Sequence, residues 1–283
     1  MKTLTTSAMA VLLFSIAVTG ARAEWRVEGE TGFFYDNNLS NSDRSADQEP
    51  DGSWKTDMRL LNSYQLLRDL RLTVAADLQG QVWSEYTDFN RISPGAETAL
   101  RYRFGLGRLA PWIMVENRIG YDRFHGVARS GWNESAGLRA GFAISDRIAF
   151  ETGYLFENFV VPDNFFDVQS HRLGARVMVD LTSSLQVTIG YDYREGDVIA
   201  YAVPPRPEIA AFAVEREEVT TFGTDPLYTG YRFPGRSHIV SVSAVYLLTR
   251  HFSVSVGYEY ASTSHDPLRY ENHLVEAKVA FAF

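Results

Sequence analysis

Cysteine is absent from this sequence of 283 residues. Disulfides therefore cannot hold the chain together, thiolates cannot bind a metal, and no Cys-x-x-Cys-His segment can attach a c-type haem. A lipid anchor on cysteine is excluded for the same reason. We expect a chain without cofactors that is held by packing or by closed hydrogen bonding.

Long apolar runs are missing beyond the N-terminus. Residues 1–23, MKTLTTSAMAVLLFSIAVTGARA, combine Lys2, an apolar run over 8–18 and a small-x-small ending. This pattern predicts a secretory signal peptide that is cleaved after Ala23. No later stretch approaches the roughly 20 apolar residues of a transmembrane helix. We therefore expect an exported chain with a single domain, residues 24–283, and no transmembrane helix.

An excess of basic residues is also missing. The chain has 27 Lys and Arg against 35 Asp and Glu, which gives a formal net charge of −8 at pH 7. Polyanions attract proteins that present a positive surface. The charge therefore argues against nucleic acid as a partner.

Catalytic signatures are sparse, and the sequence contains no Gly-x-Ser-x-Gly segment. Its nearest candidate for a hydrolase is HGVARSGWNES, which contains His125, Ser130, Asn133 and Ser135. A nucleophile needs an adjacent base, but these residues are spread around a predicted loop. His265 beside Asp266 is an equally weak candidate for a protease pair. We expect no enzyme and keep a surface lipid hydrolase as the minor alternative.

Metal-ligand spacings are missing as well. Imidazole is the commonest metal ligand in proteins, and five histidines fall near one end of the predicted strands: His125, His171, His238, His265 and His273. No two of them stand at i and i+2 on one strand. The first long loop offers acidic candidates for divalent cations, namely Asp43, Asp47, Glu49 and Asp51, although a solvated loop is the simpler expectation. The sequence predicts no metal site.

Alternation of apolar and polar residues with period two fills the chain instead, and this pattern is typical of β-strands. Twelve such stretches lie at 25–36, 54–66, 70–82, 100–106, 113–122, 133–144, 148–157, 172–179, 185–194, 240–248, 252–260 and 275–283. Their polar face carries long Arg and Glu side chains, which do not suit the dry interior of a soluble sandwich or small barrel. We predict an all-β fold, a closed antiparallel transmembrane barrel of twelve strands with a polar lumen.

The connections between these stretches alternate in length. Short turns are predicted at 68–69, 107–110, 145–147, 181–184 and 248–251. Long loops are predicted at about 38–53, 84–97, 124–132, 158–168, 195–236 and 262–271. In bacterial outer-membrane barrels the short turns are periplasmic and the long loops extracellular. We therefore expect both termini on the periplasmic side.

The chain ends in VEAKVAFAF, an alternating segment that closes on Phe283. This ending resembles the assembly signal of Gram-negative outer-membrane β-barrels, and the whole mature chain resembles that class in its porin-like form. The resemblance implies an outer-membrane location. It also implies outer-membrane lipids, lipopolysaccharide and the outer-membrane assembly machinery as partners. The oligomeric state stays open.

Charged residues on the polar face are the candidate site. The predicted lumen or pore lining consists of Arg59, Asp77, Arg101, Arg103, Glu116, Arg118, Arg139, Glu151, Arg172 and Arg176. The predicted lumen mouth carries Asp122, Asp192 and Glu259. A basic wall that faces a more acidic one predicts a narrow channel for ions or small hydrophilic solutes, with anions favoured because guanidinium groups bind carboxylate and phosphate. The alternative is a barrel filled by ion pairs, which would be a non-conducting surface binding or structural protein, or a partner subunit of an envelope complex.

A Gly-aromatic-x-aromatic repeat stands at 119–124, 153–158, 189–193 and 257–262, with a looser copy at 31–38. The alternation predicts that each Gly faces the lumen and leaves room for a long neighbouring side chain. The aromatics then face lipid as an interface girdle. The aromatic-rich range 195–236 is predicted to be one long loop that folds into the lumen, extends as a hairpin or caps the mouth.

Overall fold

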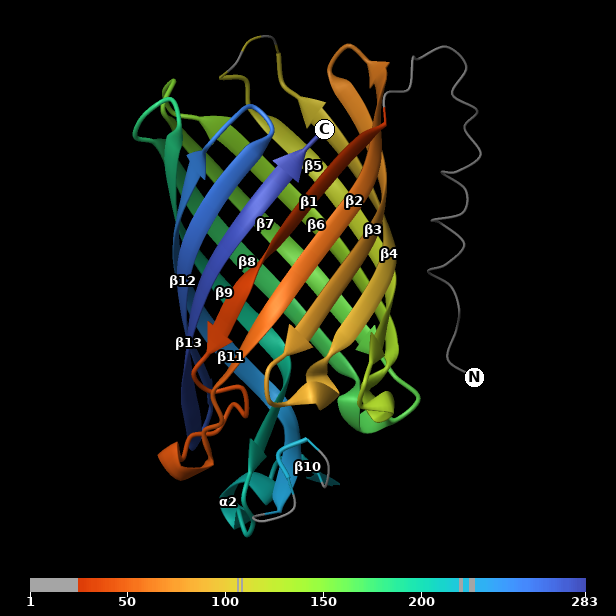
Figure 1. Cartoon of the computed structure of the whole chain (residues 1–283), viewed down its shortest axis with the longest axis vertical. Coiled ribbons are helices and arrows are strands. Elements are labelled where there is room, and N and C mark those ends of the chain that lie inside the picture. Colours follow the sequence, from red (N-terminus) through yellow and green to blue (C-terminus); the bar gives the residue numbers. More distant parts are fainter. Residues whose placement is uncertain (1–24, 106, 108, 219–220, 224–226) are drawn as a thin grey trace.

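The computed structural model describes residues 25–105, 107, 109–218, 221–223 and 227–283. The predicted signal peptide lies outside these residues. Twelve of the described strands form the wall (Figure 1): β1 (Arg26–Asp36), β2 (Asp51–Leu67), β3 (Leu70–Trp83), β4 (Arg91–Arg103), β5 (Trp112–Phe124), β6 (Gly131–Ala143), β7 (Ile148–Val160), β8 (Val168–Asp180), β9 (Leu185–Ala202), β11 (Tyr228–Leu247), β12 (Phe252–His265) and β13 (Leu268–Ala282). The short strand β10 (Val214–Glu218) pairs only with β11, outside the wall.

The wall closes on itself in two places that sequence order does not join. The first strand β1 pairs antiparallel with the last strand β13, and Val27 and Phe283 exchange backbone hydrogen bonds of 3.0 and 2.9 Å. The strand β9 pairs with β11 across the β10 insertion. Closure pairs the backbone groups that an open sheet edge would leave exposed, which is what a membrane-spanning sheet requires. The twelve-stranded antiparallel barrel predicted from the sequence is confirmed.

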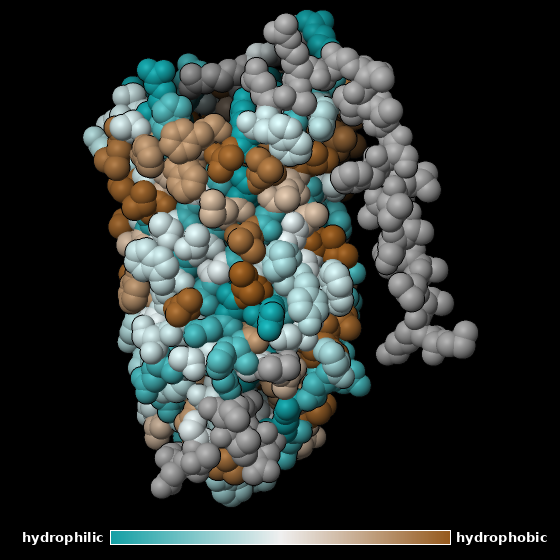
Figure 2. All heavy atoms as spheres, turned by 45° about the vertical axis from the view of Figure 1, so that its right-hand side comes forward, coloured by the Kyte–Doolittle hydropathy of each residue, from teal (hydrophilic) through white to brown (hydrophobic). Residues whose placement is uncertain are grey.

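The register of the pairs puts apolar side chains on the outside of the wall. Val115, Leu173 and Ile189 are each more than half exposed, and their chain neighbours face the lumen because successive strand residues alternate in direction. Figure 2 shows apolar side chains gathered on one face of the wall, most densely toward the end with short turns. No helix of the described residues is long and apolar enough to cross a membrane.

One end of the barrel differs from the prediction. In the range 195–236, predicted as one loop, β9 continues to Ala202 and β11 starts at Tyr228, so much of it is a paired hairpin. The predicted loop at 262–271 is also mostly strand, with a turn at Asp266-Pro267. These strands continue past the apolar band, where both faces contact protein or water. Residues 198–202, for example, are apolar on both faces, so alternation no longer reveals the strand.

The extended hairpin helps to build a cap at this end of the barrel (Figure 1). The cap consists of the rim-side ends of β9 and β11 (196–202 and 228–235), helix α2 (Pro207–Ala210), β10, and the loops with short helices η1 (Ser45–Asp47), η2 (Thr87–Phe89), η3 (Val127–Arg129) and η4 (Asn164–Phe166). Most buried apolar side chains of the described chain lie here, including Tyr228, Tyr231, Phe233 and Ile209 at 2 % exposure or less. The hydrophobic core of this barrel therefore sits across its mouth.

Candidate functional site

The strand register places all thirteen predicted lumen residues on the inner face of the wall. The ten predicted lining residues fall on β2 to β8 at positions that alternate with exposed apolar ones. Asp122, Asp192 and Glu259 fall on the inner face of β5, β9 and β12. Whether solutes pass these side chains depends on how they pair and on the space left between them.

The most buried of the described ion pairs on the inner wall joins β3 and β5. The Arg118 guanidinium donates to both carboxylate oxygens of Asp77, with Nη2 to Oδ2 at 2.7 Å, and the Asp77 side chain is fully buried. Arg118 also donates to Ser93 at 3.2 Å and to Asn133. A Cβ at Gly95 would lie 2.7 Å from the Arg118 Nη2 atom, so the glycine makes room for this pair. At this level of the barrel, paired charged side chains fill the lumen.

Two further arginines are also paired with glutamates. Arg59 contacts Glu97 and, at 4.0 Å, Glu28. Arg139 contacts Glu116 and, at 3.4 Å, Glu151. These pairs are about one-third exposed on the arginine side, so water screens them and they contribute little to stability.

Four predicted lining residues, Arg101, Arg103, Arg172 and Arg176, make no ion pair with any residue that the structure describes. Arg101 instead lies over the Trp112 ring at 4.2 Å. Arg172 and Arg176 line a cavity of about 200 Å³ together with Arg139, Glu116, Glu151 and Asp192. A larger cavity of about 800 Å³ shares Arg139 and Glu116 with it and is lined by Glu28, Glu30, Asp57 and Arg59 on its far wall.

The three predicted mouth acids lie in different surroundings. Asp122 accepts hydrogen bonds from Asn133 and, at 3.4 Å, from Arg91. Asp192 is buried beside Gly174 and lines the smaller cavity. Glu259 is half-buried on β12 and faces neighbours on β11 and β13. The cap therefore closes over a mouth that already carries acids at several positions.

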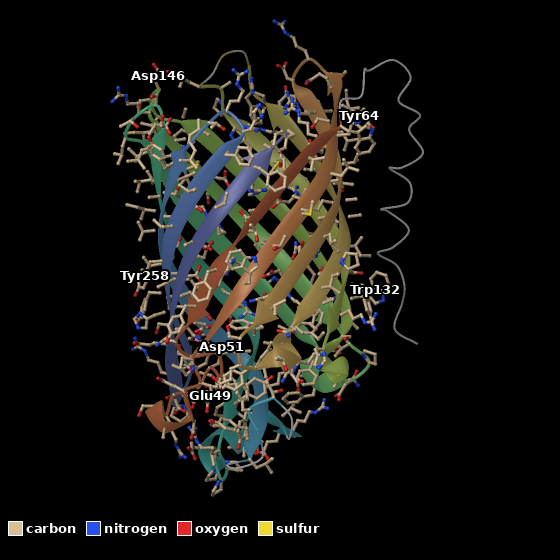
Figure 3. All side chains as sticks on the ribbon, in the orientation of Figure 1. Glu49, Asp51, Tyr64, Trp132, Asp146 and Tyr258 are labelled. Atoms are coloured by element: carbon tan, nitrogen blue, oxygen red, sulfur yellow. The ribbon has the colours of Figure 1, made fainter. Side chains whose placement is uncertain are left out.

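The acidic loop between β1 and β2 is an anchor of the cap and not a solvated loop, so that expectation is wrong. Arg206, which is 3 % exposed, donates to Asp43 at 2.8 Å and to Glu208 at 2.7 Å, and its Nη1 atom lies 4.0 Å from Asp47. The Asp51 carboxylate accepts hydrogen bonds from the backbone N–H groups of Glu85 and Tyr86. Figure 3 shows Glu49 and Asp51 together at this end of the barrel.

Glu49 joins the loop to the hairpin through two tyrosines. The hydroxyl groups of Tyr86 and Tyr228 both donate to its carboxylate. Burial and the hydrogen bond to Glu49 raise the pKa of Tyr86 and of Tyr228 well above 10. The hydrogen bond from Arg206 lowers the pKa of Glu208. Near neutral pH the two tyrosines therefore stay protonated and Glu208 stays charged, as their hydrogen bonds require.

Arg129 anchors the other side of the cap. Its guanidinium lies 4.6 Å from the Phe89 ring, 4.5 Å from Phe166 and 5.3 Å from Tyr201, and it donates to the Tyr201 hydroxyl and the Thr221 hydroxyl. A desolvated cation held among aromatic rings gains roughly 2 kcal/mol per favourable pair. Arg129 thereby ties the β5–β6, β3–β4 and β7–β8 loops to the hairpin.

The weak catalytic and metal candidates of the sequence do not come together in the described residues. Ser130 Oγ bonds the backbone of Phe124 and not His125, and Asn133 is engaged by Arg118. His265 packs on Phe212 at 4.2 Å in the cap. The described residues contain no group of three His, Cys, Asp or Glu that is able to hold a metal ion.

Sequence reasoning missed the cap anchors Arg206, Arg129 and Glu49. The aromatic content of 195–236 was the available signal, since disordered loops contain few aromatics. The partners of these residues lie on loops far away in the chain, so no local spacing reveals them.

Comparisons with known proteins show the fold. No family model matches the sequence, and no curated protein matches it. An outer membrane channel from Pseudomonas putida F1 superposes with a TM-score of 0.56 at 12 % identity, over 93 % of this chain and 97 % of that chain. The NanC porin gives a TM-score of 0.46 at 8 % identity, over 90 % and 98 %. An anion-selective porin from Comamonas acidovorans gives 0.41 at 8 % identity, over 92 % and 99 %. The chain has the fold of outer-membrane β-barrels.

Proposed function

We propose that this chain is a narrow, capped outer-membrane channel that favours small anionic solutes. The observation that carries the proposal is the lumen space beside Arg172 and Arg176. These two guanidinium groups have no carboxylate within ion-pair distance among the described residues, and both line the smaller cavity. Arg172 is half-buried and Arg176 is exposed to the lumen, and a charge must be paired or hydrated, so water or a solute anion is their partner.

The charges across the lumen support the same preference. The wall from β4 to β9 carries Arg101, Arg103, Arg139, Arg172 and Arg176. The opposite wall carries Glu28, Glu30, Asp57, Glu259 and Glu276 beside Lys55, Arg59 and Lys278. On the first wall Arg101, Arg103, Arg172 and Arg176 have no carboxylate partner among the described residues, so their charge favours anions in the lumen. Each guanidinium also offers a planar fork that matches a carboxylate or phosphate group.

In this proposal the cap limits the rate at which solutes pass through its end of the barrel. A mouth that is packed with Tyr228, Tyr231 and Phe233 at 2 % exposure or less leaves little room for a hydrated solute. Passage then requires the cap to move or to leave a narrow route along its edge. The same packing favours the second candidate function, a non-conducting structural or binding barrel.

Conductance with and without the cap separates the two candidates. Gly196 and Gly235 are directly paired at the rim, so replacing 197–234 by Asn-Gly joins them with a two-residue hairpin turn. The capped channel predicts small, discrete conductance steps in a planar bilayer for the full chain and larger ones for the shortened chain. Absence of conductance in both proteins would favour the structural barrel.

A further inference from the structure

Three of the outward tyrosines in the Gly-aromatic-x-aromatic repeat form the same side-chain pair. In each pair the tyrosine hydroxyl is hydrogen-bonded to Nδ1 of a histidine on the neighbouring strand. The pairs are Tyr154 with His171 at 2.6 Å, Tyr191 with His238 at 2.7 Å, and Tyr258 with His273 at 2.7 Å. They lie on the outer face of β7–β8, β9–β11 and β12–β13.

Register explains why the pair recurs. The second aromatic of each repeat stands directly across from the histidine: Phe156 from His171, Tyr193 from His238 and Tyr260 from His273. Their ring centroids are 5.3, 5.5 and 5.3 Å apart. The first aromatic, two residues earlier on the same face, reaches Nδ1 diagonally. The same three-residue unit is therefore built three times around the wall.

The units lie on the cap side of the apolar band. Figure 3 shows Tyr258 on one side of the wall at about the height of Trp132 on the other, above the cap in that view. Trp132 packs edge-on against Tyr121, an aromatic of the Gly-aromatic-x-aromatic repeat, with the ring centroids 5.4 Å apart. This height is where an aromatic girdle meets lipid headgroups.

Each unit leaves one imidazole nitrogen without a protein partner. Nδ1 is bonded to the tyrosine hydroxyl, and Nε2 of His171, His238 and His273 makes no hydrogen bond with a described residue. When the hydroxyl donates to Nδ1, the ring proton resides on Nε2, which is then a donor. At the level of the headgroups its acceptor is either water or a lipid oxygen.

We propose that the three Tyr–His pairs bind the phosphate groups of lipids at the outer interface, with each Nε2–H donating to a phosphate oxygen. The outer face just toward the cap adds Arg236 and Arg269, whose side chains are 68 % and 65 % exposed. Arg236 lies 3.4 Å from the Glu195 carboxylate, and Arg269 lies 3.4 Å from that of Glu271. Each arginine thereby neutralises a negative charge that would repel phosphate. Phosphate is the anion that suits both imidazole and guanidinium donors at this height.

The test measures binding of diphosphorylated lipid A to the full chain in detergent, by native mass spectrometry. The variant replaces all three histidines, His171→Phe, His238→Phe and His273→Phe, which keeps an aromatic ring against Phe156, Tyr193 and Tyr260. His251→Phe is the matched control, because His251 is also an exposed histidine stacked on an aromatic, Phe283 at 5.2 Å, but lies at the short-turn end. Heat-dependent mobility on a denaturing gel verifies that each variant is folded.

The proposal predicts that the triple variant binds lipid A roughly tenfold more weakly or worse, while the control binds like the native chain. It also predicts that lipid A without its phosphates binds the native chain and the triple variant equally. A second variant, Tyr154→Phe, Tyr191→Phe and Tyr258→Phe, keeps the imidazoles but frees their orientation, and a partial loss is expected. Equal affinity of the native chain and the triple variant for phosphorylated lipid A overturns the proposal.

Discussion

Arg118 and Asp77 lie 41 residues apart in the chain, and their side chains meet on the inner wall with Nη2 and Oδ2 at 2.7 Å. The aspartate side chain is fully buried and the arginine 16 % exposed. Removal of one partner leaves the other charge buried and unpaired, which is costly. The pair therefore holds the β3–β5 sector of the wall together.

Asp77→Leu is expected to lower the free energy of unfolding by about 3 kcal/mol. The measurement is reversible urea unfolding in lipid vesicles, followed by tryptophan fluorescence. Adding Arg118→Met removes the stranded charge, so the double variant should be more stable than the sum of the two single effects predicts. Additive effects would show that the pair is not coupled.

Gly32→Ala and Gly80→Ala are expected to have opposite effects on stability. A Cβ at the inward Gly32 would lie 2.3 Å from the Ala277 carbonyl oxygen, a backbone atom that cannot move aside. The structure places Gly80 on the outer face with nothing within 4 Å of an added Cβ. We expect a loss of roughly 1–3 kcal/mol at 32 and a gain of roughly 0.5–1 kcal/mol at 80. Similar unfolding midpoints for the two variants would contradict the packing described for the repeat.

Arg129→Met is expected to loosen the cap without unfolding the barrel. The substitution keeps an apolar stem among Phe89, Phe166 and Tyr201 but removes the cation and its hydrogen bonds. Limited proteolysis should cut the β9–β11 hairpin several-fold faster, while the heat-dependent gel mobility of the barrel is unchanged. Arg123→Met, an exposed change on the outer face of the preceding strand β5, is the control and should be cut like the native chain.

Acid is expected to release the α2 side of the cap. Because Arg206 lowers the pKa of Glu208 below its usual 4.5, the charged carboxylate is favoured in the folded cap. Its contribution is complete above pH 4.5 and is lost as the pH falls through the lower folded value. The protection factor for hydrogen exchange at α2, which corrects for the intrinsic effect of pH, should therefore fall below about pH 4.5. Glu208→Gln should make this fall smaller, and an unchanged pH profile in that variant would show that Glu208 is not the group that titrates.

Alkali is expected to act on the other side of the cap. The folded pKa values of Tyr86 and Tyr228 are raised from 10.0, so their contribution is complete below pH 10 and is lost as the pH rises through the higher folded values. Protease sensitivity of the β1–β2 loop should rise above pH 10. Tyr86→Phe with Tyr228→Phe should be sensitive already at neutral pH and should show no further change in alkali.

The sequence predicted the wall well because lipid and lumen impose opposite polarity on alternate residues. Arg139 was assigned to the lumen by this rule alone, and the same reasoning placed Gly153 in the lumen, where an added Cβ would lie 2.8 Å from the Arg139 side chain. Gly80 on β3, by contrast, faces outward between the exposed Leu78 and Val82.

The cap was not predictable for a physical reason. Arg206 and Asp43 are 163 residues apart, and Tyr228 and Glu49 are 179 apart. Beyond the lipid band both faces of a strand contact protein or water, so period two no longer distinguishes them. The pairing of individual arginines was not predictable either. Arg118 and Arg172 look alike in sequence, and they differ only in which side chains of other strands lie within reach.

The reversal potential of single channels in a planar bilayer under a KCl gradient is the most direct test of the central claim. The account predicts anion selectivity for the full chain and for the chain with 197–234 replaced by Asn-Gly. It predicts that Arg172→Ala with Arg176→Ala moves the reversal potential toward that of an unselective pore, whereas Arg236→Ala with Arg269→Ala, the same charge change on the outer face, has no effect. Cation selectivity, or selectivity that is unchanged in the double variant, would contradict it.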